Sequence, residues 1–160
     1  MSKELNIGTG VTAPFKVKEG TITITTGATA HGDIKAPVMG SEVVKGDLVE
    51  IAGEMTVAAH SSGVPIGYVA NTPKWETVEP KVNYTQAEAI SADMLREAGI
   101  ETFFKTIKTV DAKASEGITA GKYVVLKQEV ELSASSGSTA TNAIALSAQD
   151  TNNRVIIGIL

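Results

Sequence analysis

Histidine, serine and carboxylate side chains are the groups of this chain that could carry out acid–base or nucleophilic chemistry. The 160 residues include two histidines, His31 and His60, and no cysteine. His31 precedes Gly32-Asp33 in a loop, and His60 precedes Ser61-Ser62-Gly63 in a turn. Adjacent residues of a turn need not face each other, so neither group defines a catalytic pair. We expect no catalytic residue and no enzymatic activity, with an enzyme based on His31 or His60 as an alternative.

Motifs for cofactors and metals are missing from the sequence. The histidines do not stand in H-x-H or H-x-x-x-H spacing, and no phosphate-binding G-x-x-x-x-G-K-[ST] loop occurs. Gly8-Thr9-Gly10 lacks the third glycine of a dinucleotide-binding loop, and no G-x-S-x-G is present. We therefore expect no cofactor and no metal site.

Charge and hydropathy restrict the partners. The formal net charge is −4, only two residues are arginine, and the lysines are scattered, which argues against nucleic-acid binding. No run approaches the ~20 apolar residues that cross a bilayer, and the first residues lack the apolar region of a signal peptide. We expect neither a nucleic-acid partner nor a membrane partner.

The pattern of apolar residues and glycines predicts a mainly β chain. Aromatic residues make up 4% of the chain and 15 residues are glycine, which favours a turn-rich β protein with a core of small aliphatic side chains. Apolar residues alternate with polar ones between Ala36 and Tyr68, with glycines where the alternation breaks. This period of two indicates short antiparallel strands.

A second unit with the same order of features lies near the end of the chain. Val43–Val49 parallels Ile118–Val124, and Ile66–Val69 parallels Ile157–Leu160. We predict a compact β-barrel or Greek-key-like sheet of two similar β units. Residues 16–160 would form this single β-rich domain.

One amphipathic helix is predicted at about residues 85–98. Thr85 and Glu88 match a T-x-x-E capping box, and apolar residues follow at helical spacing. Gly99 is suited to end the helix. The fold class is thus α+β, mainly β, with one helix packed on the sheet.

Residues 1–15 are predicted to form an extended N-terminal arm. Their large apolar residues, Leu5, Ile7, Val11 and Phe15, are too few to order the segment alone, although Leu5 and Ile7 are spaced as in a strand. The alternative is an unordered terminus. Trp75, in a proline-flanked stretch, is either a core residue between sheet and helix or an interface anchor.

The stretch from Thr29 to Ala70 resembles the head decoration, or capsid cement, proteins of tailed phages, the lambda-type family and its relatives. Thr29-Ala30, Lys35-Ala36-Pro37-Val38-Met39 and Val64–Ala70 carry this resemblance, and Val155–Leu160 is similar to the small apolar C-terminus of the family. It covers about a third of the chain. The chain departs from the family by its greater length, its Lys45-Gly46-Asp47 turn and its serine-rich loop at residues 133–142.

The resemblance implies a structural virion protein made in the host cytoplasm. It would bind the outer surface of a phage capsid as a homotrimer and stabilise the expanded shell. The arm residues Leu5, Ile7, Val11 and Phe15 would pair with the major capsid protein, and Pro37, Met39 and Trp75 would belong to an interface. The alternative is a carbohydrate-binding or adhesin-type β module of a phage tail or cell surface, with Trp75, Tyr68, Tyr84 and Tyr123 as candidate aromatic contacts.

Overall fold

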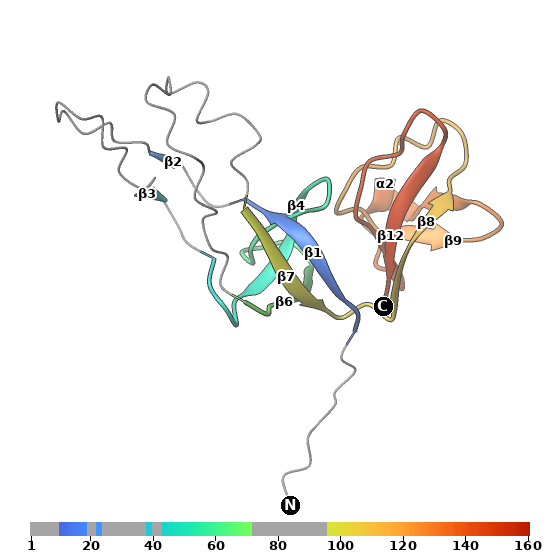
Figure 1. The fold of residues 1–160 in the computed structure, drawn as a ribbon. Coiled ribbons are helices and arrows are strands. Elements are labelled where there is room, and N and C mark those ends of the chain that lie inside the picture. The colour runs from blue at the N-terminus through green and yellow to red at the C-terminus, as the bar shows by residue number, and fades with distance from the viewer. Residues whose placement is uncertain (1–9, 19–21, 24–37, 40–42, 72–95) are drawn as a thin grey trace, which may run out of the picture.

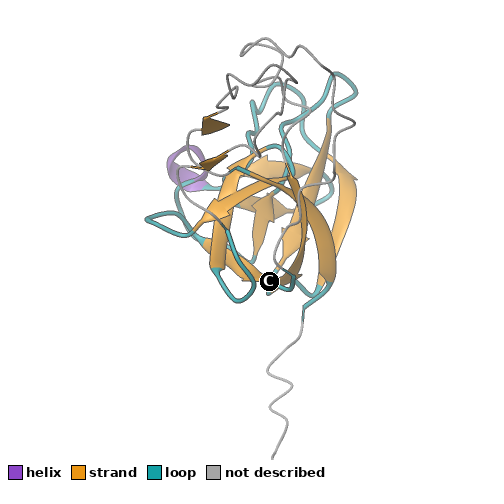
Figure 2. Cartoon of the chain, turned by 60° about the vertical axis from the view of Figure 1, so that its left-hand side comes forward, coloured by secondary structure: helices purple, strands orange, loops and turns teal. Residues whose placement is uncertain are grey.

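The part of the chain that the structure describes is built mainly of β-strands. The computed structural model describes residues 10–18, 22–23, 38–39, 43–71 and 96–160 (Figure 2). Strands form a closed barrel and a second, similar unit beside it, which Figure 1 shows in blue to yellow and in yellow to red. The predicted β-barrel fold is therefore confirmed, and each of the two β units curves round on itself.

Five strands close the first barrel. Their order is β1 (Thr12–Val17), β5 (Thr56–Ala59), β4 (Leu48–Gly53), β6 (Pro65–Val69) and β7 (Arg96–Thr102), with β7 pairing back to β1. β1 and β5 are parallel, and all other neighbours are antiparallel. Alternate side chains point inward and form an aliphatic core around one phenylalanine, comprising Phe15, Val17, Val49, Val57, Ile66, Val69, Ala98 and Ile100.

The second unit repeats this strand order. It contains β8 (Thr106–Asp111), β9 (Val124–Leu126), β10 (Val130–Leu132), β11 (Ala143–Ala145) and β12 (Arg154–Ile159). β12 pairs with β8 and β11, and β9 pairs with β10. Single bridges, the parallel Ala112–Val130 and the antiparallel Tyr123–Ile144, join these sheets. The strands of the second unit therefore follow the order β8-β10-β9-β11-β12, and β12 pairs back with β8. The first barrel has the same order, and in each unit the only parallel contact among the described strands joins the first strand to the third strand along the chain.

Backbone hydrogen bonds align the two units residue by residue. Donors and acceptors at equivalent places in the two ladders lie 2.7–3.0 Å apart. The matching donor–acceptor pairs are Lys18–Val57 with Lys113–Val130, Gly46–Val69 with Gly121–Ala145, and Ala70–Gly99 with Leu146–Ile156. The chain therefore contains a structural duplication.

The predicted match between Val43–Val49 and Ile118–Val124 is confirmed. Gly46 and Gly121 have φ values of +91° and +85°, in the region that glycine adopts at low cost. Each glycine turns the chain into a strand, β4 or β9, with a buried valine at its second or first position.

The predicted match between Ile66–Val69 and Ile157–Leu160 is wrong. β6 is equivalent to β11, because Tyr68 pairs with Leu48 as Ile144 pairs with Tyr123. β12, which contains Ile157, is equivalent to β7. The two apolar-Gly-apolar stretches are alike in local sequence but occupy different places in the two ladders.

The predicted helix at residues 85–98 is wrong at its C-terminal end. Residues 72–95 lie outside the described residues, but residues 96–98 belong to β7, and Gly99 is inside that strand rather than after a helix. β7 pairs along β1, with Phe15 opposite Ala98, and Ala98 is buried. Sheet pairing and burial override the local helix-ending signal here.

Two smaller features lie outside the ladders. β2 (Ile22–Thr23) pairs with β3 (Val38–Met39). The serine-rich loop contains the four-residue turn α2 (Ala134–Gly137), with Ser135 and Ser136 in the left-handed region. Gly137 is buried against Lys122 and Leu132, so this loop packs on the second unit, although its small polar residues predict otherwise.

The two units share one hydrophobic cluster. Phe104, in the connection between β7 and β8, is fully buried in a cluster that contains first-barrel residues together with Ile144 and Leu146 of the second unit. A Cβ at Gly158 on β12 would stand 2.6 Å from the Phe104 ring, so only glycine leaves room for it. The Met55 N–H also donates to Leu146 O across the units at 2.8 Å. These contacts join the units into one body.

Replacement of Phe104 tests this shared cluster. We expect Phe104→Ala to lower the free energy of unfolding by about 3–5 kcal/mol, because it removes a buried ring between two packed surfaces. Chemical denaturation followed by circular dichroism measures the change. The control is Phe103→Ala at the neighbouring exposed position, for which we expect about 1 kcal/mol or less. Equal losses in the two variants would contradict the role of Phe104.

Candidate functional site

The predicted arm residues separate into different environments. Phe15 is 1% exposed and lies in the core of the first barrel, so its assignment to a capsid-binding arm is wrong. The physical reason is the register of β1, which places Phe15 and Val17 on the inner face. Val11 is 38% exposed. Leu5 and Ile7 lie outside the described residues, as do the predicted interface residues Pro37 and Trp75 and the loop histidine His31.

The boundary of the arm moves toward the N-terminus. β1 begins at Thr12, and Val11 already pairs with the chain after β7, because its N–H donates to Phe104 O at 2.9 Å. A Cβ at Gly10 would overlap the backbone oxygens of Thr102 and Phe104, so the chain can lie this close only as glycine. The domain therefore begins at about residue 10, not 16. Met39, another predicted interface residue, belongs to β3.

Two exposed aromatic side chains meet close to the backbone where β1 begins. Tyr68 on β6 is 45% exposed and Phe103, just after β7, is 39% exposed. Their rings meet edge to face, with centroids 5.5 Å apart and planes at 84°. Val11 is on the neighbouring chain segment, which accepts a hydrogen bond from Thr102 N–H. We call the pair of Tyr68 and Phe103 the aromatic end.

The geometry of β6 explains why Tyr68 is exposed. Gly67 and Val69 on either side of it are buried, and alternation turns Tyr68 to the outside. An edge-to-face pair is the favoured arrangement of two rings and leaves their outer faces to solvent. Large aromatic residues at a surface are typical anchors of protein interfaces. The alternation around Tyr68 was visible in the sequence, but its proximity to Phe103 follows from the pairing of β6 with β7.

Glu50 organises the turn that contains His60. His60 Nδ1 donates to Glu50 Oε2 at 2.9 Å, and the backbone N–H groups of Ser61, Ser62 and Gly63 donate to the same oxygen at 2.7–3.2 Å. Ser61 Oγ lies 3.4 Å from Glu50 Oε1. Histidine and serine thus both bind the carboxylate, so their geometry is that of a clamped turn and not of a nucleophile with its base.

The Glu50 carboxylate is stabilised in its ionised form. The backbone N–H of Ser61, followed by those of Gly63 and Ser62 and the His60 ring, lowers the pKa of Glu50 against the opposing effect of burial. A carboxylate with a lowered pKa stabilises the folded state above its unfolded pKa, and this contribution is lost as the pH falls through the folded value.

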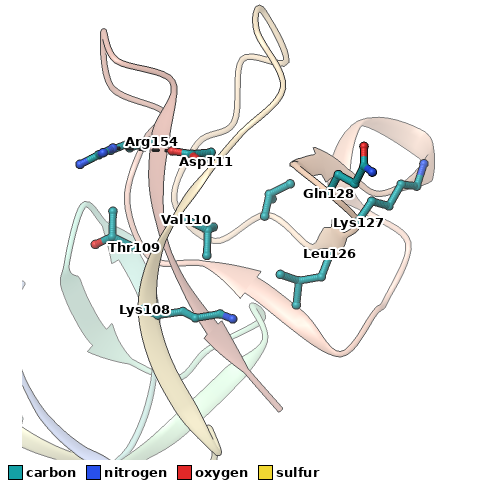
Figure 3. A pocket seen from close by; sticks show the side chains of 9 residues that line it. Lys108, Thr109, Val110, Asp111, Leu126, Lys127, Gln128 and Arg154 are labelled. Atoms are coloured by element: carbon teal, nitrogen blue, oxygen red, sulfur yellow. Dashed lines mark ion pairs between the residues drawn. The ribbon is translucent and has the colours of Figure 1, made fainter.

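A cationic groove lies on the second unit. A cavity of about 480 Å³ is lined by residues 108–111 of β8, residues 126–128 and Val130 of the β9–β10 hairpin, and Arg154 of β12. In Figure 3, Lys108 and Val110 extend from β8 toward Leu126 on β9. The lining carries three cationic side chains, Lys108, Lys127 and Arg154, and one carboxylate, Asp111. Sequence analysis missed this site because its charges come from strands that are far apart in the chain.

The charges of the groove are partly paired. Arg154 Nε lies 3.6 Å from Asp111, and Lys127 Nζ lies 2.6 Å from Glu131, outside the lining. Glu131 also holds Lys113 at 3.5 Å. Lys108 has no partner among the described residues. The groove therefore has a net positive lining on a chain whose formal net charge is −4.

Comparison of the chain with protein-family models, with curated protein sequences and with solved structures gives no significant match. None of the helices in the described part of the chain has the length and hydropathy of a membrane span. Within the same ranges, no group of three histidines or carboxylates is placed to hold a metal ion.

Replacement of Glu50 tests the clamped turn. We expect Glu50→Gln to lower the free energy of unfolding by about 1–3 kcal/mol at pH 7, because three backbone N–H groups lose a charged acceptor. The difference from the wild type should shrink at low pH, once the pH has fallen through the lowered pKa of Glu50 and the wild-type carboxyl is itself protonated. Urea denaturation at pH 7 and at a low pH measures it. The control is Glu54→Gln, at an exposed position on the same hairpin, which should change the free energy of unfolding by about 0.5 kcal/mol or less at either pH. A loss of stability in Glu50→Gln that does not depend on pH would contradict the role of the ionised Glu50 carboxylate in the turn.

Proposed function

We propose that this chain is a structural virion protein that binds the outer surface of a phage capsid and stabilises the expanded shell. The sequence resemblance to head decoration proteins supports this proposal. The observation that carries it is the aromatic end, an exposed apolar surface beside the point where residues 1–9 join the first barrel. Residues 1–9 and an apolar surface beside their point of attachment can bind the same partner.

The proposed contact has two parts. Residues 1–9, with Leu5 and Ile7 in strand-like spacing, add as a strand to a sheet edge of the major capsid protein. Tyr68 and Phe103 bury their rings against the same protein and supply apolar contact area. Gly10 and Val11 are anchored to the strand connection that carries Phe103 and Phe104, so the two parts are held together.

Assembly of the chain as a homotrimer would strengthen this contact. Three aromatic ends and three arms on one particle bind the capsid at once, and each contact raises the effective concentration of the others. Multivalent attachment compensates for the entropy that an extended arm loses on binding. The rigid shared cluster between the units keeps the surfaces at constant positions relative to one another.

A carbohydrate-binding or adhesin-type module is the second candidate. The favouring observation is the exposed ring of Tyr68, because an aromatic face at a surface can stack on a sugar ring. Tyr123 packs against the shared cluster and is only partly exposed, and Trp75 and Tyr84 lie outside the described residues. A glycan array probed with the wild-type chain separates the two candidates, since glycan binding that is lost in Tyr68→Ala would replace the capsid proposal.

Capsid binding by truncated and substituted chains tests the proposal. We expect the chain to co-sediment with expanded phage heads that lack their decoration, and removal of residues 2–9 to abolish binding while the barrel stays folded. The combined Tyr68→Ala and Phe103→Ala variant should raise the Kd at least tenfold, because two aromatic anchors are lost.

The control is Val44→Ala, which alters an exposed apolar residue that is not part of the aromatic end and should leave the Kd unchanged. Circular dichroism confirms that every variant is folded. Failure of the wild-type chain to bind heads would overturn the proposal. Undiminished binding without residues 2–9 would remove the arm from it.

A further inference from the structure

The seam between the first and third strands has fewer paired residues in the second unit than in the first barrel. In the first barrel, β1 and β5 share two pairs, Lys16–Thr56 and Val17–Val57, and Lys16 N–H donates to Met55 O at 2.9 Å. In the second unit, only Ala112 and Val130 pair. The cationic groove lies at this opened seam, between β8 and the β9–β10 hairpin (Figure 3).

The groove exposes an unpaired edge of β8. Ala112 N–H donates to Asn153 O on the β12 side, and Lys113 N–H donates to Val130 O on the β10 side. Successive residues of a strand alternate their N–H groups between its two sides. The N–H groups of Thr109 and Asp111 therefore point toward the groove, where no described residue accepts from them.

A proline removes a backbone N–H from the equivalent edge of β1 in the first barrel, and the edge of β8 has no proline there. The matching hydrogen bonds of Lys18 and Lys113 place Pro14 of β1 at the position of Thr109 of β8. Proline has no N–H to donate and protects a free strand edge from pairing with another chain. Thr109 keeps its N–H, so the β8 edge is open to a further strand.

We propose that the cationic groove binds an extended acidic peptide segment of a partner protein, which adds as a strand to the free edge of β8. The main-chain groups of Thr109 and Asp111 supply the ladder hydrogen bonds, and acidic side chains on one face of the peptide meet Lys108 and Lys127. The cavity of about 480 Å³ is within the ~300–1,000 Å³ range of ligand sites. This inference is independent of the proposed capsid function.

Charge decides which occupant the groove favours. A second copy that paired β8 with β8 would bring two cationic linings together and two chains of net charge −4 into contact, both of which oppose pairing. An acidic strand instead meets Lys108, which has no carboxylate partner among the described residues, and Lys127 of the facing hairpin. An acidic peptide is therefore the occupant to which the proposal commits.

Titration of the full chain with a synthetic peptide tests the proposal. The probe is an acetylated, amidated heptapeptide of alternating glutamate and valine, and the matched probe has lysine in place of glutamate. We expect saturable NMR shifts of the Ile107, Thr109 and Asp111 amides with the acidic peptide and slower hydrogen exchange at Thr109 and Asp111. No saturable shift with the acidic peptide, or equal binding of the lysine peptide, would overturn the proposal.

Two substitutions locate the binding. Thr109→Pro removes the ladder donor and should abolish saturable binding, and Pro14 shows that the fold accepts proline at this position. Lys108→Glu should weaken binding about fivefold or more, whereas Lys105→Glu, at an exposed lysine outside the groove lining, should leave it unchanged.

Thermal melts establish that the variants are folded. If Thr109→Pro does not fold, the affinity of Lys108→Glu for the acidic peptide alone tests the proposal. Binding that persists in both Thr109→Pro and Lys108→Glu would overturn the proposal. Self-association of the wild-type chain that is lost in Thr109→Pro would also overturn it, in favour of a second copy. The same amide shifts on addition of a short oligonucleotide would replace the peptide by a nucleic acid.

Discussion

The packing of Phe104 against Gly158 is the constraint on which the described structure depends. A buried ring in the strand connection between the two units occupies space that any side chain at position 158 would fill. Because protein interiors are close-packed, the Phe104 ring fits against Gly158 in one arrangement and cannot shift gradually to others. The backbone hydrogen bond from Met55 to Leu146 adds a second attachment. The surfaces of the two units are thereby held in a constant relation.

The duplicated ladder carries different surfaces on its two copies. The loop after the third strand is short in the first barrel and clamped by Glu50, whereas in the second unit it is longer and contains α2. The seam beside the first strand carries Pro14 in one unit and Thr109 in the other. A shared ladder does not imply a shared function, because function depends on the side chains that the ladder presents.

The two candidate surfaces have opposite chemistry. The aromatic end is apolar and lies where the described chain begins, while the groove is cationic and lies on an open strand edge. Apolar area is suited to stable attachment, and charge is suited to selecting a partner and speeding its approach. Under the two proposals, the body that joins the surfaces would hold one bound partner at a constant position relative to the other.

Local sequence pattern is enough to predict the β character, the Gly46 and Gly121 turns and the presence of two similar units, because period-two alternation and positive-φ glycines act over a few residues. The folded chain is needed to show that Phe15 is a core residue, that residues 96–98 are strand, and that β6 corresponds to β11. Each of these depends on strand pairing between distant residues, from 20 apart for Leu48 and Tyr68 to 83 apart for Phe15 and Ala98, which local pattern does not encode. The aromatic end and the cationic groove are likewise products of register. Tyr68 meets Phe103, and Lys108 and Lys127 line one cavity, only after the ladders have formed.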